Sequence, residues 1–488
     1  MKHLADLWPD INAAYAAISI SAVTLDSREV KQGALFIALK GLHRDARDFI
    51  ADVIAAGAVA VFAEQDEKWP QETVVNGVPV ITIPHLAGQA GMIASRFFDE
   101  PSQRMKVLAV TGTNGKTSVA NLLAAALTRL NHSSAVLGTL GNGRAGQLEK
   151  STHTTLDACH LQALLSKFAD EGAQYIAMEA SSHGLVQGRL NGTAIDVAIF
   201  TNLTRDHLDY HGTMENYATA KEILFRWPGL KAAVLNADDP AAARYRAVIA
   251  PQVRVISYSQ RADSHADVRA LQVRPTLSGL QIQLSTPVGD AILSVGLLGR
   301  FNVSNILAVV AGLLALDISL TDIVQSLNFT TPVPSRMESF SGAHPTVVVD
   351  YAHTPDALEK VLASLREHAE ANLICVFGCG GDRDSGKRPL MGQIASRLAD
   401  RVIVTNDNPR SENPESIVSD ILAGASAGVT VTMDRRHAIR DAIASAGRRD
   451  IVLIAGKGHE DYQEIAGVRH PFSDAQEVRA ALALWRAT

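Results

Sequence analysis

One loop constrains the fold of this 488-residue chain more than any other feature: Val107-Leu-Ala-Val-Thr-Gly-Thr-Asn-Gly-Lys-Thr-Ser118. A β-branched apolar run leads into Gly112 and Gly115, and the apolar stretch after them is typical of a helix. Glycines let backbone N–H groups converge on phosphate oxygens, and the positive end of the following helix adds to their field. Lys116 is expected to reach the β- and γ-phosphates, and the Thr117 hydroxyl is expected to reach Mg²⁺. The pattern predicts a nucleoside triphosphate site.

The loop departs from the standard G-x-x-x-x-G-K-[ST] pattern, because Val110 stands where the first glycine is expected. A chance Gly-Lys-Thr in a surface turn is the alternative, and the strand–loop–helix context disfavours it. The residues expected to bind the nucleotide here are Gly112, Thr113, Asn114, Gly115, Lys116, Thr117 and Ser118.

The length suggests about three domains, because a single hydrophobic core seldom extends so far. Apolar strands, polar loops and alanine-rich helices recur, which predicts α/β domains with largely parallel sheets. Proline-containing breaks divide the chain into about 1–104, 105–334 and 335–488. Within the middle segment, residues 270–296 alternate between apolar and polar and predict antiparallel hairpins beside the main sheet.

Composition excludes several classes of protein. A hydrophobic content of 47% with 20% charged residues is typical of a globular domain. The net charge of -6 argues against a nucleic-acid-binding surface. The cysteines Cys159, Cys375 and Cys379 form no C-x-x-C pair and are expected to be buried thiols. No signal peptide and no apolar run of roughly 20 residues is evident, so a cytoplasmic protein without membrane insertion is expected.

Polar segments follow most of the predicted strands. In parallel sheets, ligands bind beyond the carboxyl ends of the strands. Any one polar residue there is as easily a solvated turn residue, but the whole set favours a binding site. The segments are Glu179–His183, Thr201–His207, Asn236–Asp239, Asp350–His353, Gly378–Asp384, Thr405–Arg410 and Ala455–Glu460.

Glu179, His207 and the Thr117 hydroxyl form a candidate set of ligands for one or two Mg²⁺ ions, although imidazole is an unusual Mg²⁺ ligand. A core histidine bonded to the backbone is the alternative for His207, and the dense polar residues at 206–211 argue against it. Lys221 lies in a helical stretch, where a solvated lysine is the simpler interpretation. Its ammonium would be repelled near Mg²⁺ unless an anionic partner or a chemical change intervened.

The third segment carries groups suited to an amino acid. Arg410, at the end of Asp407-Asn-Pro-Arg410, can capture a carboxylate in a bidentate manner, and Arg383 can capture a second one. Gly456 and Glu460 can bind an amino group. Together they predict a substrate with both carboxylates and amines, while a surface salt bridge is the alternative for any one of them.

These segments resemble the Mur ligase family of ATP-dependent amide-bond-forming enzymes, over nearly the whole chain. Residues 111–117 look like the family's own phosphate loop, which accounts for the missing glycine. Residues 298–305 resemble its adenine-side motif, with Asn305 as the base contact. Arg336, Asp350 and His353 resemble the residues with which the C-terminal domain closes on ATP. The implied fold has a P-loop-type central domain, a Rossmann-like C-terminal domain and a smaller N-terminal UDP-binding domain.

The resemblance also implies a donor site and a modified lysine. Lys221 matches the lysine that CO₂ carbamoylates, which would replace its positive charge with a metal-binding carboxylate beside Thr117, Glu179 and His207. The implied catalytic residues are Lys116, Glu179, His207 and Lys221. The implied contacts to UDP are Leu25, Ser27, Leu42, His43 and Arg44, and those to the sugar-peptide are His153, Thr154, Thr155, Ser181, Gln187 and Arg189.

By the same resemblance, the chain is expected to be an ADP- and phosphate-forming ligase of peptidoglycan precursor synthesis that uses ATP and Mg²⁺ and acts as a monomer. The motif Asp407, Asn408, Pro409 and Arg410 resembles that of members that add meso-diaminopimelate to UDP-N-acetylmuramoyl-L-alanyl-D-glutamate. The second carboxylate of meso-diaminopimelate suits Arg410, and a site built around a guanidinium should discriminate against lysine.

Three alternatives remain open. A lysine-adding homologue is disfavoured by Arg410. Folylpolyglutamate synthetase shares the ligase architecture but lacks the long N-terminal domain. A nucleotide-dependent switch that forms no bond leaves Lys221 and the polar strand ends of the third segment without a role.

Overall fold

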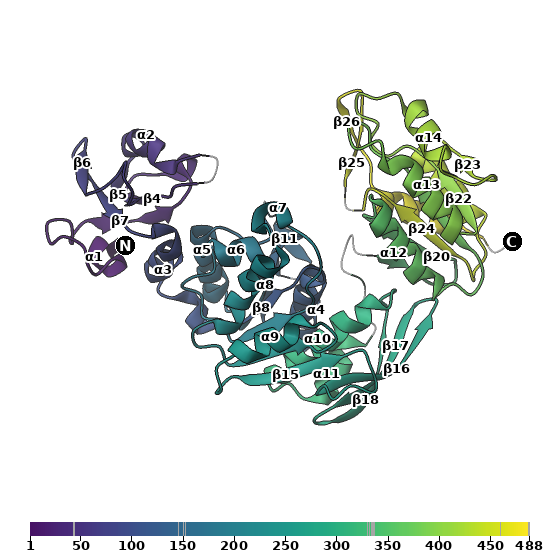
Figure 1. Ribbon diagram of the computed structural model, residues 1–488, viewed down its shortest axis with the longest axis horizontal. Helices are drawn as coiled ribbons and strands as arrows, with labels where there is room; N and C mark the ends of the chain where they lie inside the picture. Colours follow the sequence, from purple (N-terminus) through teal and green to yellow (C-terminus); the bar gives the residue numbers. More distant parts are fainter. Residues whose placement is uncertain are drawn as a thin grey trace. The chain divides into compact units, whose positions relative to one another are not determined.

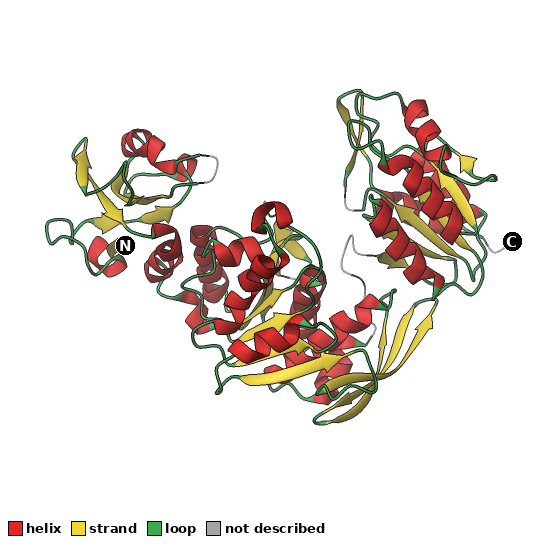
Figure 2. Cartoon of the chain, viewed as in Figure 1, coloured by secondary structure: helices red, strands yellow, loops and turns green. Residues whose placement is uncertain are grey.

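Figure 1 shows the computed structural model of the chain. The structure describes residues 1–41, 44–144, 146–149, 151, 153–328, 330, 332, 337–458 and 460–486. They form two compact units, one of residues 1–259 with 308–319 and the other of residues 260–307 with 320–488. Strands and helices alternate through most of both units (Figure 2), so the predicted α/β class is confirmed.

The first unit begins with a five-stranded sheet, parallel except for β6. Its strands, in spatial order, are β3 (Ala22–Thr24), β4 (Ala34–Ala38), β5 (Ala58–Glu64), β7 (Val78–Ile83) and β6 (Thr73–Val75). Around it lie β1 (Lys2–His3), α1 (Leu4–Leu7), β2 (Ser19–Ile20), α2 (Ile50–Ala55) and α3 (Leu86–Phe97). The strand β4 is buried along its whole length, because both faces of a parallel sheet are covered.

The same unit contains the sheet that carries the phosphate loop. Strands β9, β12, β8, β13, β14 and β15 are parallel neighbours in that order, and β10 and β11 add an antiparallel edge. The strands are β8 (Lys106–Thr111), β9 (Ser134–Gly138), β10 (Gly141–Arg144), β11 (Gln147–Glu149), β12 (Tyr175–Glu179), β13 (Val197–Phe200), β14 (Ala232–Asn236) and β15 (Arg254–Ser259). The helices are α4 (Lys116–Arg129), α5 (Ala158–Asp170), α6 (Ser182–Val186), α7 (Leu208–His211), α8 (Met214–Glu222) and α9 (Ala241–Val248). The predicted mostly parallel sheet is confirmed.

Antiparallel hairpins open the second unit, as the alternation at 270–296 predicts. They consist of β16 (Val268–Thr276), β17 (Gly279–Thr286) and β18 (Gly289–Val295). Along the chain, α10 (Phe301–Ala315) and α11 (Leu320–Leu327) come next, and residues 308–315 of α10 belong to the first unit. The helix α11 packs against β18.

The rest of the second unit is a six-stranded sheet, parallel except for β19. In spatial order its strands are β19 (Glu338–Phe340), β20 (Thr346–Asp350), β24 (Ile451–Ala455), β21 (Leu373–Phe377), β22 (Arg401–Val404) and β23 (Thr430–Val431). The helices are α12 (Pro355–Arg366), α13 (Lys387–Leu398), α14 (Pro414–Leu422), α15 (Arg435–Ala444) and α16 (Asp474–Leu484), and β25 (Tyr462–Ile465) with β26 (Val468–Pro471) forms a separate hairpin.

Two composition-based predictions can be compared with these elements. All three cysteines are buried and form no disulfide, which confirms the prediction of buried thiols. In the part of the chain that the structure describes, no helix is long and apolar enough to cross a membrane. The domain boundaries at 104 and 334 stay predictions.

Candidate active site

The phosphate loop has the predicted strand–loop–helix form, between the end of β8 and the start of α4 at Lys116. Gly112 and Gly115 have φ values of 150° and 86°, which residues other than glycine seldom adopt. A Cβ added at Gly112 would lie 1.9 Å from the hydroxyl oxygen of Thr201. The loop therefore requires glycine at this position for steric as well as conformational reasons.

A second segment, at the end of β13, braces the loop. The backbone N–H of Thr113 donates to the Asn202 carbonyl at 2.8 Å, and the N–H of Asn114 donates to Asn202 Oδ1 at 2.9 Å. The hydroxyl of Thr201 donates to the Asn114 carbonyl at 2.6 Å. These bonds hold the loop in shape before any phosphate binds.

Glu179 lies at the carboxyl end of β12, next to the phosphate loop. Thr117 Oγ1 donates to Glu179 Oε2 at 3.0 Å, and the N–H of Thr139 donates to Glu179 Oε1 at 2.7 Å. The glutamate is only 1% exposed. A hydroxyl and a carboxylate at this distance are hard oxygen donors of the kind that Mg²⁺ prefers, so both residues fit the predicted metal.

Two lysines approach the same carbonyl oxygen in the loop. Lys116 Nζ donates to the carbonyls of Gly112 and Thr113, both at 2.8 Å, and Lys221 Nζ donates to Gly112 at 3.0 Å. Lys221 is 1% exposed, and its Nζ lies 4.3 Å from the centroid of the Tyr217 ring. Burial, followed by the charge of Lys116, lowers the pKa of Lys221 well below its ordinary value. The site thus favours the uncharged amine of Lys221 more than solvent does.

His207 begins the turn before α7 in a left-handed conformation with φ of 52°. Its side chain is 46% exposed, and its Nε2 lies 3.5 Å from Asp206 Oδ2. The rings of His207 and His183 meet edge to face, with their centroids 5.0 Å apart. The exposure of the ring does not match the alternative of a core histidine. Its role as a metal ligand stays a prediction.

A cavity of about 270 Å³ joins several of these residues. Its lining includes most of the predicted contacts to the sugar-peptide together with both lysines. The lining residues are Lys116, His153, Thr154, Thr155, Ser181, Ser182, His183, Arg189, His207, Tyr217 and Lys221. Ser182, His183 and Tyr217 are not among the predicted site residues. Ser182 and His183 belong to the polar segment after β12, so the sequence could have indicated them. No feature of the sequence indicated Tyr217.

Hydrogen bonds order the predicted sugar-peptide residues among themselves. Arg189 Nη1 donates to the Thr155 carbonyl and Arg189 Nε to Gln187 Oε1, both at 2.8 Å. Thr155 Oγ1 donates to the Glu179 carbonyl at 2.9 Å and accepts the N–H of Ser181 at 3.0 Å. Through Thr155, the predicted peptide-binding residues are fixed directly to the end of β12.

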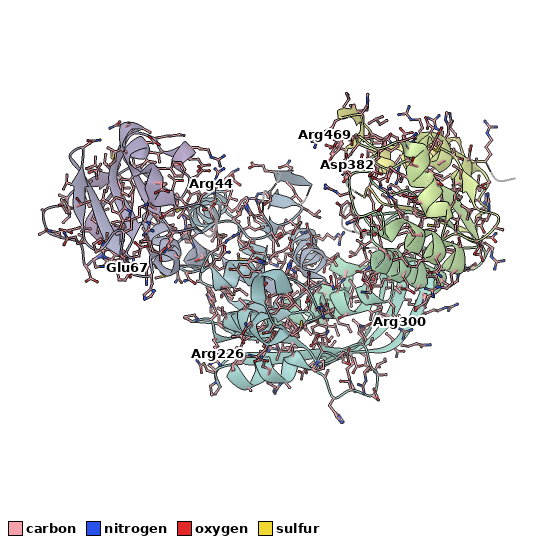
Figure 3. All side chains as sticks on the ribbon, turned by 45° about the horizontal axis from the view of Figure 1, so that its top comes forward. Arg44, Glu67, Arg226, Arg300, Asp382 and Arg469 are labelled. Carbon is pink, nitrogen blue, oxygen red and sulfur yellow. The ribbon has the colours of Figure 1, made fainter. Side chains whose placement is uncertain are left out.

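The predicted UDP contacts are only partly described. Leu25 and Ser27 are half-buried near the end of β3, and Arg44 is exposed (Figure 3). Leu42 and His43 lie outside the described residues, as does Arg336 of the predicted ATP-closing set.

The other predicted nucleotide residues lie in the second unit. Asn305 is buried and its Nδ2 donates to Asn302 Oδ1 at 2.8 Å. Asp350, at the end of β20, accepts the N–H of Met337 at 2.9 Å. The exposed His353 follows it, with Nδ1 2.8 Å from the Tyr351 carbonyl.

In the second unit, the predicted amino-acid residues come together at the carboxyl ends of β22 and β24. Arg410 has φ of 52°, and its Nη1 donates to the Gly381 carbonyl at 2.7 Å. Asp407 is buried, and burial raises its pKa. A Cβ at Gly456 would lie 2.5 Å from Asp407 Oδ2. Arg383 is exposed in the neighbouring loop. Figure 3 labels Asp382, which precedes it in the sequence.

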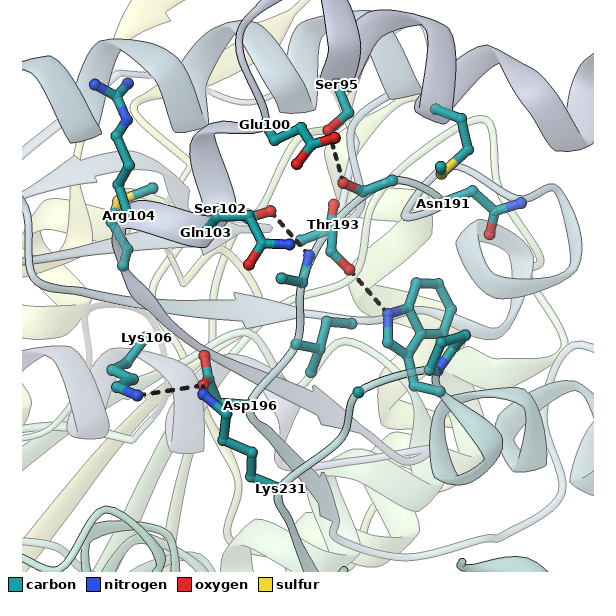
Figure 4. A pocket seen from close by; sticks show the side chains of 18 of the residues that line it. Ser95, Glu100, Ser102, Gln103, Arg104, Lys106, Asn191, Thr193, Asp196 and Lys231 are labelled. Carbon is teal, nitrogen blue, oxygen red and sulfur yellow. Dashed lines mark hydrogen bonds and ion pairs between the residues drawn. The ribbon is translucent and has the colours of Figure 1, made fainter.

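A larger cavity, of about 1090 Å³, lies elsewhere in the first unit (Figure 4). Lys106 Nζ and Lys231 Nζ lie 3.6 and 2.6 Å from Asp196 Oδ1 in its wall. These residues stand at the amino ends of β8, β13 and β14, whereas ligands of parallel sheets bind at the carboxyl ends. The smaller cavity is therefore the candidate active site.

Comparison with known proteins identifies the family of the chain. Residues 110–313 match the family model of the Mur ligase middle domain, residues 335–458 that of the Mur ligase glutamate ligase domain, and residues 19–98 that of the Mur ligase family catalytic domain. A protein of Ectopseudomonas mendocina named UDP-N-acetylmuramoyl-L-alanyl-D-glutamate–2,6-diaminopimelate ligase is 50% identical, over 97% of each chain. The chain belongs to the Mur ligase family.

Other Mur ligases are also similar to this chain in sequence and in structure. The enzyme of the same name from Pseudomonas aeruginosa is 50% identical over 96% of each chain. A solved structure with this enzyme name covers 99% of each chain with 39% identity and a TM-score of 0.81. The predicted resemblance to the Mur ligase family is confirmed.

Proposed function

We propose that this chain is an ATP-dependent ligase that joins meso-diaminopimelate to UDP-N-acetylmuramoyl-L-alanyl-D-glutamate in the cytoplasm, forming ADP and phosphate during peptidoglycan precursor synthesis. The names of full-length relatives at 50% identity support this substrate pair. One observation carries the chemistry: Thr117 bonds to Glu179 next to two lysines that share the Gly112 carbonyl, and both lysines line a cavity with polar walls.

In the first step, the side-chain carboxylate of the D-glutamyl residue attacks the γ-phosphorus of ATP. A bond forms from the carboxylate oxygen to phosphorus, and ADP leaves, giving an acyl phosphate. Such transfers depend mainly on positioning and on neutralising charge. Lys116 would turn from the Gly112 and Thr113 carbonyls to the phosphate oxygens, while Arg189 and Ser181 hold the dipeptide in the cavity.

Thr117, Glu179, His207 and a carbamoylated Lys221 would hold the metal. Bound Mg²⁺ supplies positive charge to the phosphoryl oxygens. Within the described ranges, no three His, Cys, Asp or Glu side chains gather around one point, so the set depends on the hydroxyl and on the modified lysine. An uncharged Lys221 amine can attack CO₂, forming a C–N bond and releasing a proton to leave a carboxylate. The lowered pKa of Lys221 favours this reaction.

In the second step, an uncharged amine of diaminopimelate attacks the acyl carbon. The nitrogen gives up one proton, which leaves with the phosphate, and the C–O bond to phosphate breaks as the tetrahedral intermediate collapses to an amide. Arg410 would hold a carboxylate of the acceptor, and Glu460 would hold an ammonium. Arg383, exposed in the adjacent loop, is available for a second carboxylate.

Phosphate release tests the proposal. Purified protein with ATP, Mg²⁺ and the UDP-dipeptide should release phosphate with meso-diaminopimelate and far less with L-lysine or no acceptor. A preference for lysine would indicate the lysine-adding homologue, and activity with folate but not with the UDP-dipeptide would indicate folylpolyglutamate synthetase. A rate of phosphate release that is the same with every acceptor and without one would indicate a nucleotide-dependent switch that forms no bond. Size-exclusion chromatography would test the proposed monomer.

A further inference from the structure

A buried lysine that the proposed chemistry does not use lies beside the predicted acceptor site. Lys457 follows β24 and is 0% exposed. Its Nζ donates to Glu460 Oε2 at 2.9 Å and to Asn408 Oδ1 at 3.0 Å, and it lies 5.6 Å from the centroid of the Tyr462 ring. Both hydrogen-bond partners belong to the predicted substrate-binding set. A charged group so deeply buried requires such partners, because burial of a lone charge is costly.

The bonds around Asn408 close a triangle with Lys457 and Glu460. Asn408 Nδ2 donates to Glu460 Oε2 at 2.7 Å, and Asn408 Oδ1 also accepts the N–H of Glu464 at 2.9 Å. This pattern fixes the orientation of the amide, because its oxygen faces two N–H donors and its nitrogen faces a carboxylate. Each of the three side chains therefore determines the position of the other two.

The triangle leaves the two oxygens of Glu460 in different states. Oε2 accepts bonds from both Lys457 and Asn408, whereas no described residue donates to Oε1. The side chain of Glu460 retains 20% of its exposure, although that of Lys457 has none. The carboxylate is thus held by one oxygen, and the other can receive a further donor.

The backbone around Lys457 is closely constrained. Gly456 and Gly458, on either side of it, have φ values of 116° and 53°. A Cβ at Gly458 would lie 2.7 Å from that of Tyr351, so the loop is closely packed. The N–H of Glu460 donates to the Lys457 carbonyl at 3.0 Å, which ties the two residues within one turn.

We propose that Lys457 is a positioning residue for the acceptor amino acid. It fixes Glu460 and Asn408 so that Oε1 of Glu460 meets the ammonium group of the acceptor in one orientation, and it balances the carboxylate charge while the site is empty. The proposal rests on the proposed function, in which Glu460 binds an acceptor amine. Preorganisation of this kind lowers the cost of binding, because the receptor group is already in place.

Replacement of Lys457 separates this role from a general structural one. In K457M, the KM for meso-diaminopimelate should rise about 10- to 100-fold, because a hydrogen bond to a charged group is lost and Glu460 can rotate. The KM values for ATP and for the UDP-dipeptide should stay within about 2-fold, and kcat at saturating acceptor should change little. K360M is the matched control, because Lys360 is an exposed lysine in the same unit, bonded to Asp356 on α12. It should leave all three KM values unchanged.

A double-mutant cycle tests whether Lys457 acts through Glu460. E460Q alone should raise the KM for the acceptor, and adding K457M to E460Q should raise it no further. Independent, multiplicative effects of the two changes would overturn the proposal. So would an unchanged KM in K457M, or equal increases in the KM for ATP and for the acceptor.

Two further measurements cover the remaining outcomes. If K457M does not fold, K457Q keeps an N–H donor without the charge, and it should show the same selective rise in acceptor KM. If K457Q instead binds meso-diaminopimelate like the wild type, the inference is wrong. Hydroxylamine trapping of the acyl phosphate without acceptor should give wild-type rates in K457M. Wild-type protein that traps no acyl phosphate would contradict the proposed function itself, whatever Lys457 does.

Discussion

Lys221 Nζ donates a hydrogen bond of 3.0 Å to the carbonyl oxygen of Gly112, inside the phosphate loop. Lys116 Nζ donates to the same oxygen at 2.8 Å. Two ammonium groups so close together repel each other, and burial of Lys221 adds to the cost of its charge. The loop that needs one positive charge for phosphate therefore disfavours a second one.

Replacing Lys221 with alanine should abolish ligase activity, since it removes the amine that forms the proposed carbamate. Small carboxylic acids should restore part of the activity by supplying a carboxylate in the vacated space. Intact-protein mass spectrometry under CO₂ should show one added carboxylate on the wild type and none on K221A. K231A is the control and should retain activity, because Lys231 pairs with Asp196 at the amino ends of the strands, away from the phosphate loop. Full turnover by K221A would rule out a required carbamate.

Gly138→Ala should disturb Glu179 without touching the phosphate loop. An added Cβ would lie 2.3 Å from Glu179 Oε1 and 2.9 Å from Cγ and Cδ of that side chain. The backbone of Gly138 does not require glycine, since its φ is not positive. We expect kcat to fall about 10-fold or more, with a higher Mg²⁺ requirement, because the carboxylate must leave Thr117. Steady-state rates across a Mg²⁺ titration would measure this, and a wild-type profile would show that Glu179 tolerates the shift.

Replacing Arg410 with alanine or lysine should raise the KM for meso-diaminopimelate about 10- to 100-fold, because a bidentate guanidinium–carboxylate contact is lost. The KM for ATP should change little. Discrimination against L-lysine should weaken at the same time, since no half-buried guanidinium is then left without a carboxylate partner when lysine binds. Competition between the two acceptors provides the measurement. An unchanged KM would remove Arg410 from acceptor recognition.

The phosphate loop and the strand-end residues could be predicted because their signals are local in sequence. A β-branched run, two glycines and a following helix specify the loop, and the parallel topology then brings the ends of β8, β12 and β13 to one edge. The hairpins of the second unit follow likewise from alternation. The chemical roles of these residues stay predictions, since geometry alone does not assign them.

Lys457 could not be found in this way. Its partner Asn408 lies 49 positions away in sequence, and a lysine between two glycines in a polar loop is typical of a solvated residue. The contact of Thr139 with Glu179 is also distant, at 40 positions. Burial of Lys221 depends on packing between α8 and the phosphate loop, which no periodicity records. Long-range packing decides which polar residues of a strand-end set become partners.

The stability of the second unit should fall in mild acid because of His368. This buried histidine accepts the Gly299 N–H at Nε2, at 2.8 Å, and donates from Nδ1 to the Thr276 carbonyl at 2.9 Å. Protonation would place a proton on Nε2, facing the Gly299 N–H, and break that bond. Burial lowers the pKa of His368 below its ordinary value of 6.5, although the Thr276 bond and the charge of Glu367 oppose this effect.

The sign of the effect follows from proton binding. Between the folded and unfolded pKa values of His368, the unfolded chain binds more protons, so stability rises with pH there. Neutral His368 makes its full contribution to the free energy of unfolding above about pH 6.5. This contribution is lost as the pH falls toward the pKa of the folded state, at a rate of up to about 1.4 kcal/mol per pH unit. In H368Q, which can still accept and donate but does not titrate, unfolding by urea should depend less on pH between about 7 and 5. Equal pH dependence in both proteins would show that His368 does not contribute to acid sensitivity.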